Sequence, residues 1–270
     1  MKEIVHLDGK PLDENLPLRS LLYAEGVFET FRWKNSPPVF LKNHIERMSD
    51  GAELLRIPFP GAEKVRKDVE AAVKASGIED AYVKICLMSS GPLKFYELAD
   101  RGHLLAIVRV YEPPDEHVRA HVSSFRRRSS PLLAIKSLNY LENVLARREA
   151  KSMGYDEAIF LNAWEEVTEG SSTNIFWVKS NVLHTPALEC GLLPGITRDA
   201  LISLAPELGL GVKEGKFTLK DVLNSQGAFF TNSLIGITAI SAVDGVKINL
   251  DDDLYAKLKG LLLEKLGWVD

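Results

Sequence analysis

Lys136 is the residue of this sequence whose position most suggests covalent chemistry. It follows the apolar pair Ala134-Ile135 and precedes the amphipathic stretch "SLNYLENVLARREA". Burial disfavours the charged form of an amine and lowers its pKa, and a neutral amine can attack an aldehyde to form an imine. The alternative is a lysine at a strand end whose charged group reaches solvent. The lysine by itself does not separate these two interpretations.

Two further stretches contain groups suited to a charged ligand with a nitrogen ring. In "LLPGITRDALI", residues 192–202, Gly195 allows close backbone approach. The N–H groups of Ile196 and Thr197 begin a helix there, which favours a bound phosphate. In "VTEGSSTNIFW", Glu169 lies in a polar turn before a strand and could pair with a protonated ring nitrogen. The alternatives are a helix start capped by Thr197 itself and a solvated turn glutamate.

Together these groups indicate a pyridoxal phosphate site, which requires an amine, a phosphate cradle and a partner for the ring nitrogen. The sequence resembles the class IV pyridoxal-phosphate-dependent aminotransferase family, fold type IV, which includes branched-chain aminotransferase, D-amino-acid aminotransferase and aminodeoxychorismate lyase. The resemblance covers nearly the whole chain. It is carried, in the family's order and spacing, by "GVFETFR", "HIERM", "IKSLNYLENVLARREA", "VTEGSSTNIF", "LLPGITRDALI" and "FFTNSL".

The resemblance implies a role for each matching residue around pyridoxal 5′-phosphate. Lys136 would bind the cofactor covalently, Glu169 would pair with its pyridine nitrogen, and Tyr140 would face its phenolic oxygen. Asn174 would support the glutamate turn, or would serve the fold alone. The residues implied for the phosphate group are Arg47 of "HIERM", Ile196, Thr197 and Ser233 of "TNSL".

Thr30 and Tyr23 bear on which reaction the chain performs. Thr30 in "GVFETFR", with "TNSL", resembles aminodeoxychorismate lyase, which would convert 4-amino-4-deoxychorismate to p-aminobenzoate and pyruvate. The Thr30 hydroxyl could pass a proton to the departing pyruvate enol, although threonine is also a common strand residue. Tyr23 lies where the family places an aromatic residue near the substrate. The alternatives are a transaminase acting on branched-chain L-amino acids or D-amino acids, and an inactive cofactor-binding relative, against which the intact Lys136 and Glu169 argue.

The residue that would bind a substrate carboxylate is not evident from the sequence. Several relatives have an arginine after the strand expected at 81–88, where this chain has "MSSGPLKFYELADRGH". The candidates are Lys94, Arg101, Arg32, Arg109, the cluster 126–128, or a residue of a partner subunit. Members of the family are usually homodimers, and residues 89–102 are the loop expected to cross to the neighbouring subunit.

The elements that must position these residues form an α+β fold of two domains. A smaller N-terminal domain is expected over residues 1–112, a linker over 113–120 in the proline-containing "YEPPDEH" region, and a larger cofactor-binding domain over 121–270. In the first domain, hairpins are expected around Asp8-Gly9 and around a turn at 34–38, and strands at 81–88 and 103–111. Helices are expected at 43–56, with Asn43 and Glu46 as a capping box, and at 62–76.

The second domain is expected to alternate helices and strands. Helices are predicted at 138–152, from Ile196 onwards, after a Thr218 cap, and at 252–266. Strands are predicted near 156–162, 174–179 and 181–185 and in "AFFTNS", and a hairpin turns over Asp244-Gly245.

The bulk composition excludes several functional classes. The net charge of −4 does not favour nucleic-acid binding. The two cysteines, Cys86 and Cys190, have no metal-ligand spacing and fit a reducing cytoplasm. The N-terminus lacks the apolar run of a signal peptide, and no segment has 18 consecutive apolar residues. The sequence therefore does not indicate a membrane protein. We therefore expect a cytoplasmic, homodimeric enzyme that acts on a small-molecule amine and binds no metal.

Overall fold

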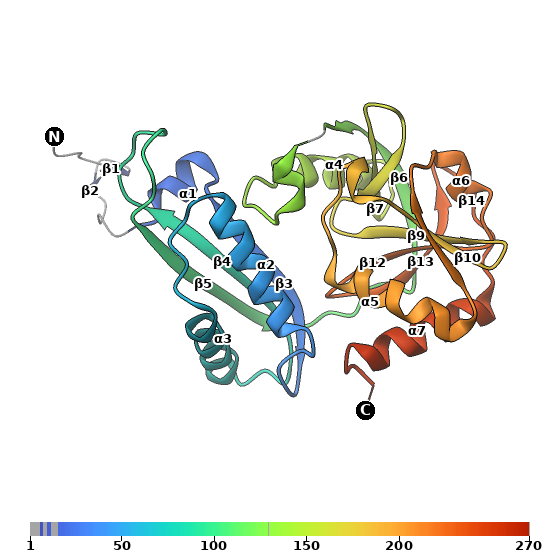
Figure 1. Cartoon of the computed structure of the whole chain (residues 1–270), viewed down its shortest axis with the longest axis horizontal. Helices are drawn as coiled ribbons and strands as arrows, with labels where there is room; N and C mark the ends of the chain where they lie inside the picture. Colours follow the sequence, from blue (N-terminus) through green and yellow to red (C-terminus); the bar gives the residue numbers. More distant parts are fainter. Residues whose placement is uncertain (1–5, 8–9, 12–15, 129, 270) are drawn as a thin grey trace.

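The computed structural model of the chain describes residues 6–7, 10–11, 16–128 and 130–269, and these residues contain three β-sheets. Strands β1 (His6–Leu7) and β2 (Lys10–Pro11) form a two-stranded antiparallel sheet. Figure 1 shows the other two sheets in separate lobes that lie side by side. No helix within these described ranges combines the length and the apolar character that crossing a bilayer requires.

The N-terminal lobe is built on three antiparallel strands, β3 (Gly26–Lys34), β4 (Asp80–Ser90) and β5 (Arg101–Val110). Helices α2 (Leu41–Leu54) and α3 (Ala62–Ser76) pack on one face of this sheet. Because strand side chains alternate between faces, Val27, Phe31 and Trp33 join this core. Phe28 and Thr30 of the same strand therefore face the other lobe.

A short helix, α1 (Leu18–Tyr23), packs against the end of β4 through a buried arginine. Arg19 pairs with Glu25 through Nε at 2.5 Å and donates to the carbonyls of Pro92 and Lys94. This arginine therefore holds the loop between β4 and β5 against α1. Large apolar side chains on α1 and this loop remain exposed: Leu21, Leu22, Tyr23, Phe95, Tyr96 and Leu98.

The C-terminal lobe contains a nine-stranded mixed sheet in the order β11-β10-β9-β12-β13-β6-β7-β8, with β14 paired to β13. The strands are β6 (His117–Arg127), β7 (Glu157–Asn162), β8 (Val167–Gly170), β9 (Asn174–Lys179), β10 (Val182–Pro186), β11 (Gly211–Gly215), β12 (Ala228–Asn232), β13 (Gly236–Val243) and β14 (Val246–Lys247). The helices are η1 (Pro131–Ala134), α4 (Leu141–Ser152), η2 (Leu188–Cys190), α5 (Ile196–Leu204), η3 (Ala205–Leu208), α6 (Leu219–Leu223) and α7 (Asp252–Lys265).

The segment that carries Lys136 connects the two lobes. The Phe28 N–H donates to the Lys136 carbonyl at 2.8 Å, and the Leu138 N–H donates to the Gly26 carbonyl at 2.9 Å. A Cβ on Gly26 would lie 2.5 Å from a Leu138 methyl carbon and 2.7 Å from the Leu87 carbonyl oxygen, so this approach requires glycine. The lysine-bearing backbone is thus hydrogen-bonded to the sheet of the opposite lobe.

Most elements predicted from local patterns are confirmed. Helix α3 ends before Gly77 at φ 67°, α6 begins with a Thr218 capping box, and β13 and β14 form the hairpin over Asp244-Gly245. Strands β1 and β2 pair as predicted, while their turn residues 8 and 9 lie outside the described residues.

Three predictions about these elements are wrong, namely the second hairpin, the helix cap and the turn at Glu169. Strand β3 pairs with β4, and residues 35–40 lead into α2 instead of forming a hairpin. Helix α2 begins at Leu41 without a side-chain cap, so Asn43 and Glu46 form no capping box. Strand β6 begins at His117, inside the expected linker 113–120. Glu169 lies in strand β8, and the polar turn is confined to residues 171–173.

Candidate active site

A cleft of about 480 Å³ brings together most of the residues selected from the sequence. Its walls come from β3 and β4 in one lobe and from the ends of β6, β8 and β12 and the start of α5 in the other. The selected residues that line it are Thr30, Arg47, Lys136, Tyr140, Glu169, Asn174, Ile196, Thr197 and Ser233. A cleft of this size accommodates a cofactor with a small substrate.

The amine of Lys136 lies against aromatic rings inside this cleft. Its Nζ is 4.6 Å from the ring centroid of Phe28 and 5.7 Å from that of Tyr140. Burial lowers the pKa of Lys136 to about 8, and the positive charge of Arg47 acts in the same direction. A fraction of the amine is therefore uncharged near neutral pH, as a nucleophile or base requires.

Glu169 is a buried carboxylate with two partners from the chain. It is 7% exposed; its Oε1 accepts from Arg127 Nη2 at 3.2 Å and its Oε2 accepts from the Leu193 N–H at 3.0 Å. Burial raises its pKa, although Arg127 and the Leu193 N–H oppose that rise. A further N–H donor in the cleft would stabilise the charged carboxylate.

Arg127 is a site residue that sequence reasoning did not identify individually. It was included only in the cluster 126–128 proposed for a substrate carboxylate, but it is 3% exposed and its guanidinium lies 3.8 Å from the centroid of the Phe160 ring. It also pairs with Glu142. The available signal was its position at the end of an alternating strand pattern, where one of the three arginines must point inward.

Arg47 is fixed by a fully buried acid from β3. Glu29 accepts hydrogen bonds from Arg47 Nε at 2.8 Å and from Arg47 Nη2 at 2.7 Å. Its carboxylate also lies within hydrogen-bond distance of His44 Nδ1, at 2.6 Å. Burial alone would raise the pKa of Glu29, but the charges of Arg47 and His44 outweigh it and lower that pKa to about 2. Arg47 Nη1 also donates to the Pro194 carbonyl at 2.7 Å, which attaches the loop before α5 to the opposite lobe.

The start of α5 forms a donor set suited to an anion. No side chain caps this helix, so Thr197 does not cap it as the alternative interpretation required. Thr197 Oγ1 lies 3.1 Å from Ser233 Oγ, and a Cβ on Gly195 would lie 1.9 Å from Asn174 Oδ1. Within the described residues, buried Thr231 Oγ1 on the cleft wall has no hydrogen-bond partner. These groups fit a phosphate-bearing ligand.

Tyr140 contributes a hydroxyl whose O–H already donates a hydrogen bond within the chain. Its OH donates to the Ser171 carbonyl at 2.8 Å, and its ring meets Phe28 edge-on at 5.2 Å between centroids. Burial raises the pKa of Tyr140 far above its ordinary value, and the negative charge of Glu169 adds to that effect. The hydroxyl therefore stays protonated and can only accept a further hydrogen bond.

Lys84 is a cleft cation that sequence reasoning missed. It lies directly opposite Thr30 in the β3–β4 register, and both residues line the cleft. Its Nζ is 4.4 Å from the centroid of the Phe28 ring, and among the described residues it has no ion-pair partner. The signal was its place in "AYVKICL", where the alternation puts Tyr82 and Lys84 on the face away from the apolar core.

Four of the other proposed carboxylate ligands, and Tyr23, lie elsewhere, whereas Arg126, Arg127 and Arg128 of the proposed cluster line the cleft. Arg32 pairs with Asp80 through two bonds of 2.7 and 2.6 Å, Lys94 lies near Glu97, and Arg109 stacks on Tyr82. Neither these three residues nor Arg101 lines the cleft. Tyr23 is 43% exposed at the end of α1, where its hydroxyl donates to the Leu93 carbonyl, so a single copy does not place it at the cleft.

This arrangement matches a known family of enzymes. The sequence profile described as Amino-transferase class IV matches residues 26–243, so the chain belongs to the class IV aminotransferases and has their fold type IV architecture. Members of this family depend on pyridoxal 5′-phosphate, which is therefore the cofactor of this chain.

The most similar proteins carry two different names. The chain is 35% identical over 257 residues to the "Putative branched-chain-amino-acid aminotransferase" of Methanocaldococcus jannaschii, covering 91% of this chain and 89% of the relative. It is 29% identical over 286 residues to the aminodeoxychorismate lyase of Bacillus subtilis, covering 98% of each. A crystal structure of the "Putative 4-amino-4-deoxychorismate lyase" of Legionella pneumophila superposes with a TM-score of 0.86 at 31% identity, covering 91% of this chain and 92% of that one.

Proposed function

We propose that the chain is an aminodeoxychorismate lyase, which converts 4-amino-4-deoxychorismate to p-aminobenzoate and pyruvate. The observation that carries this proposal is the hydroxyl of Thr30 on the cleft wall, next to Lys84, for which the described part of the chain provides no ion-pair partner. A proton donor beside a cation suits the release of an anionic leaving group. The similarity to the B. subtilis lyase over 98% of both chains supports the same reaction.

The residues that would hold the cofactor follow from the donor groups of the cleft. Lys136 would supply the amine for covalent attachment, and Glu169, which lines the same cleft, would accept a hydrogen bond from the ring nitrogen. Tyr140 would accept a hydrogen bond from the ring hydroxyl of the cofactor, because its own O–H donates to the Ser171 carbonyl. The phosphate would be bound by Arg47, Ser233 and the first N–H groups of α5, at Ile196 and Thr197. We assign the larger lobe as the cofactor-binding domain on this basis.

The reaction then depends on proton transfers by this chain's own side chains. When bound, the cofactor supplies an aldehyde for the substrate amine and a ring that withdraws electrons. Lys136 removes the proton from the carbon that bears the amine. The electron pair of that C–H bond enters the substrate ring, which becomes aromatic as the C–O bond to the pyruvate enol breaks. Thr30 then donates a proton to the methylene carbon of the departing enolate, which becomes pyruvate, and Thr30 regains a proton from the Lys136 ammonium group.

Positive charge in the cleft suits the carboxylates of this substrate. Lys84, Arg126 and Arg128 line the cleft along with Arg47 and Lys136, whereas its acids are Glu142 and Glu169. Arg126 already pairs with Glu165 at 2.8 Å. Lys84 lies beside Thr30 and has no such partner within the residues that the structure describes, so we assign it to a substrate carboxylate.

The second candidate function is transamination of branched-chain L-amino acids or of D-amino acids. The 35% identity to the M. jannaschii protein named as a branched-chain aminotransferase favours it. The same Lys136 and Glu169 would serve that reaction. The difference lies in the fate of the substrate, because a transaminase needs a keto acid to accept the amino group and a lyase does not.

We further propose that two copies associate in a homodimer in the cytoplasm. The exposed apolar side chains on α1 and on the loop between β4 and β5, among them Leu21, Tyr23, Phe95 and Tyr96, form a surface that a second copy would cover. In that assembly Tyr23 or residues 89–102 of the partner would reach the cleft. The two free, buried cysteines, Cys86 and Cys190, suit a reducing compartment.

A substrate assay separates the two functions. The protein loaded with pyridoxal phosphate is incubated with 4-amino-4-deoxychorismate alone, and in parallel with leucine or D-alanine plus 2-oxoglutarate. Pyruvate and p-aminobenzoate formed without any keto acid would support the lyase. Glutamate formed from 2-oxoglutarate, with no pyruvate formed from 4-amino-4-deoxychorismate, would contradict the lyase assignment and support a transaminase.

A further inference from the structure

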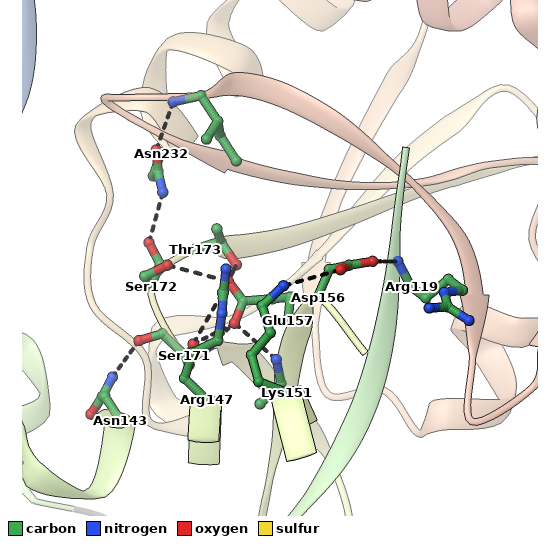
Figure 2. Close-up of polar contacts among 12 residues, drawn as sticks. Arg119, Asn143, Arg147, Lys151, Asp156, Glu157, Ser171, Ser172, Thr173 and Asn232 are labelled. Atoms are coloured by element: carbon green, nitrogen blue, oxygen red, sulfur yellow. Dashed lines mark hydrogen bonds and ion pairs between the residues drawn. The ribbon is translucent and has the colours of Figure 1, made fainter. Parts of the chain in front are cut away.

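A buried carboxylate lies behind the cleft and outside its lining. Glu157, the first residue of β7, is 4% exposed. It accepts from the Ala158 N–H at 2.8 Å, the Ser171 N–H at 3.1 Å and Ser172 Oγ at 3.2 Å. The hydroxyl of Ser171 and the guanidinium of Arg147 also contact it, and Figure 2 shows these groups converging on the carboxylate. Glu157 is thus the centre of the 171–173 turn.

On one side this turn holds the tyrosine of the cleft. The Ser171 carbonyl accepts from Tyr140 OH at 2.8 Å and from Asn143 Nδ2 at 2.8 Å. The single O–H of Tyr140 donates its hydrogen bond to this carbonyl, so only the lone pairs of the Tyr140 oxygen remain to accept from a ligand. The orientation of the Ser171 carbonyl therefore decides the direction in which Tyr140 can accept.

On its other side the same turn holds the loop that carries Ser233. The Ser172 carbonyl accepts from Asn232 Nδ2 at 3.0 Å, as Figure 2 shows. Asn232 Oδ1 in turn accepts from the N–H groups of Leu234 and Ile235, each at 2.9 Å. Ser233 lies between these residues and contacts Thr197 at the start of α5. One turn therefore connects two walls of the cleft.

The turn has little freedom to adopt another shape. The Gly170 N–H donates to the Thr173 carbonyl at 2.7 Å, and a Cβ on Gly170 would lie 2.0 Å from Thr173 Oγ1. Glu169, which precedes Gly170, and Asn174, which follows the turn, both line the cleft. A buried carboxylate is costly unless donors surround it, so its presence under this turn calls for a reason beyond packing.

We propose that Glu157, assisted by Arg147, is a positioning residue for the reaction. It fixes the 171–173 turn so that the Ser171 carbonyl orients Tyr140 and the Ser172 carbonyl holds the Ser233 loop through Asn232. Glu157 itself does not line the cleft and acts only through these groups. The inference rests on the roles proposed above for Tyr140 and Ser233 toward the cofactor.

The test compares Glu157→Gln with Glu149→Gln in the holoenzyme. Glu149 is the matched control, because it also accepts from two consecutive serines, from Ser123 Oγ at 2.9 Å and the Ser124 N–H at 3.1 Å in strand β6, and does not line the cleft. We expect Glu157→Gln to shift the visible absorbance of the bound cofactor and to lose cofactor about 10-fold faster on dilution. Its kcat should fall roughly 10–100-fold, with KM nearly unchanged, and Glu149→Gln should behave like the wild type.

A double-mutant cycle with Tyr140→Phe tests the route of the effect. If Glu157 acts through Tyr140, the losses of kcat in Glu157→Gln and Tyr140→Phe will not multiply in the double variant. If Glu157→Gln does not fold, the same measurements are made on Arg147→Gln, which removes the half-exposed partner of Glu157. We expect smaller changes in absorbance, cofactor loss and kcat, in the same direction.

The outcomes separate this inference from the proposed function. A wild-type protein that binds no pyridoxal phosphate would overturn the assignments of Tyr140 and Ser233, and the inference with them. A normal wild-type spectrum together with Glu157→Gln or Arg147→Gln indistinguishable from Glu149→Gln would overturn the inference alone. Losses that multiply fully in the cycle would also overturn it.

Discussion

Two buried glutamates flank the cleft from opposite lobes, and their surroundings differ. Glu29 of the N-terminal lobe meets Arg47 and His44, which hold its pKa at about 2. Glu169 of the C-terminal lobe has a raised pKa, because Arg127 and one backbone N–H do not offset its burial. The first acid is fully paired by the chain, whereas the second gains from a ligand that donates a hydrogen bond. This difference agrees with a structural role for Glu29 and with the binding role proposed for Glu169.

The largest effect is expected at the amine between these two acids, whose pKa both of them influence. Lys136→Ala removes the group that we propose binds the cofactor covalently and transfers protons. Activity should fall on the order of 10³-fold or more, and the visible absorbance of bound cofactor should disappear after dialysis. Thermal unfolding of the variant provides the control for folding. Retention of the absorbance band would show that another residue binds the cofactor.

The next prediction compares the two acids directly. Glu29→Gln leaves Arg47 and His44 buried without their anion, so the free energy of unfolding should fall by about 3–5 kcal/mol. Glu169→Gln relieves the burial of a charge and should change that free energy by less than about 1 kcal/mol, while weakening cofactor binding. Urea unfolding and cofactor titration measure the two quantities. Equal losses of stability in both variants would remove the distinction.

The pH dependence of stability should separate the two acids by sign. The pKa of Glu29 is lowered from 4.5 to about 2, so its contribution of about 3 kcal/mol is present above pH 4.5 and lost as pH falls toward 2. The pKa of Glu169 is raised, so its contribution is present below pH 4.5 and lost as pH rises through the folded pKa. Urea unfolding from pH 3 to 7 should show the wild type approaching Glu29→Gln at low pH. Parallel curves would contradict this.

The smallest effect is expected for a change at Thr30, in strand β3 of the N-terminal lobe. Thr30→Val keeps the shape of the strand residue but removes the hydroxyl, so release of pyruvate should slow by about 10²-fold. Cofactor absorbance should be unchanged, because Thr30 is not among the residues assigned to cofactor binding. Any transamination measured in the same preparation should be much less affected. Equal losses in both reactions would leave no reason to rank the lyase first.

Local sequence patterns predicted the groups of the site better than their surroundings. Lys136, Glu169 and the start of α5 could be selected because each lies in a short motif with its own chemistry. The strand that carries Glu169 was taken for a turn, because four residues give little periodicity. Lys84 and Arg127 were missed because their inward direction depends on which strands pair, and the partner of β3 lies about fifty residues away along the chain.

The backbone pairing between Lys136 and β3 limits how this enzyme can exchange its ligands. A hinge motion that separated the lobes would have to break the hydrogen bonds from Phe28 to Lys136 and from Leu138 to Gly26. It would also carry the reactive amine away from the walls that surround it. We therefore expect substrates and products to enter and leave the cleft without separation of the two lobes.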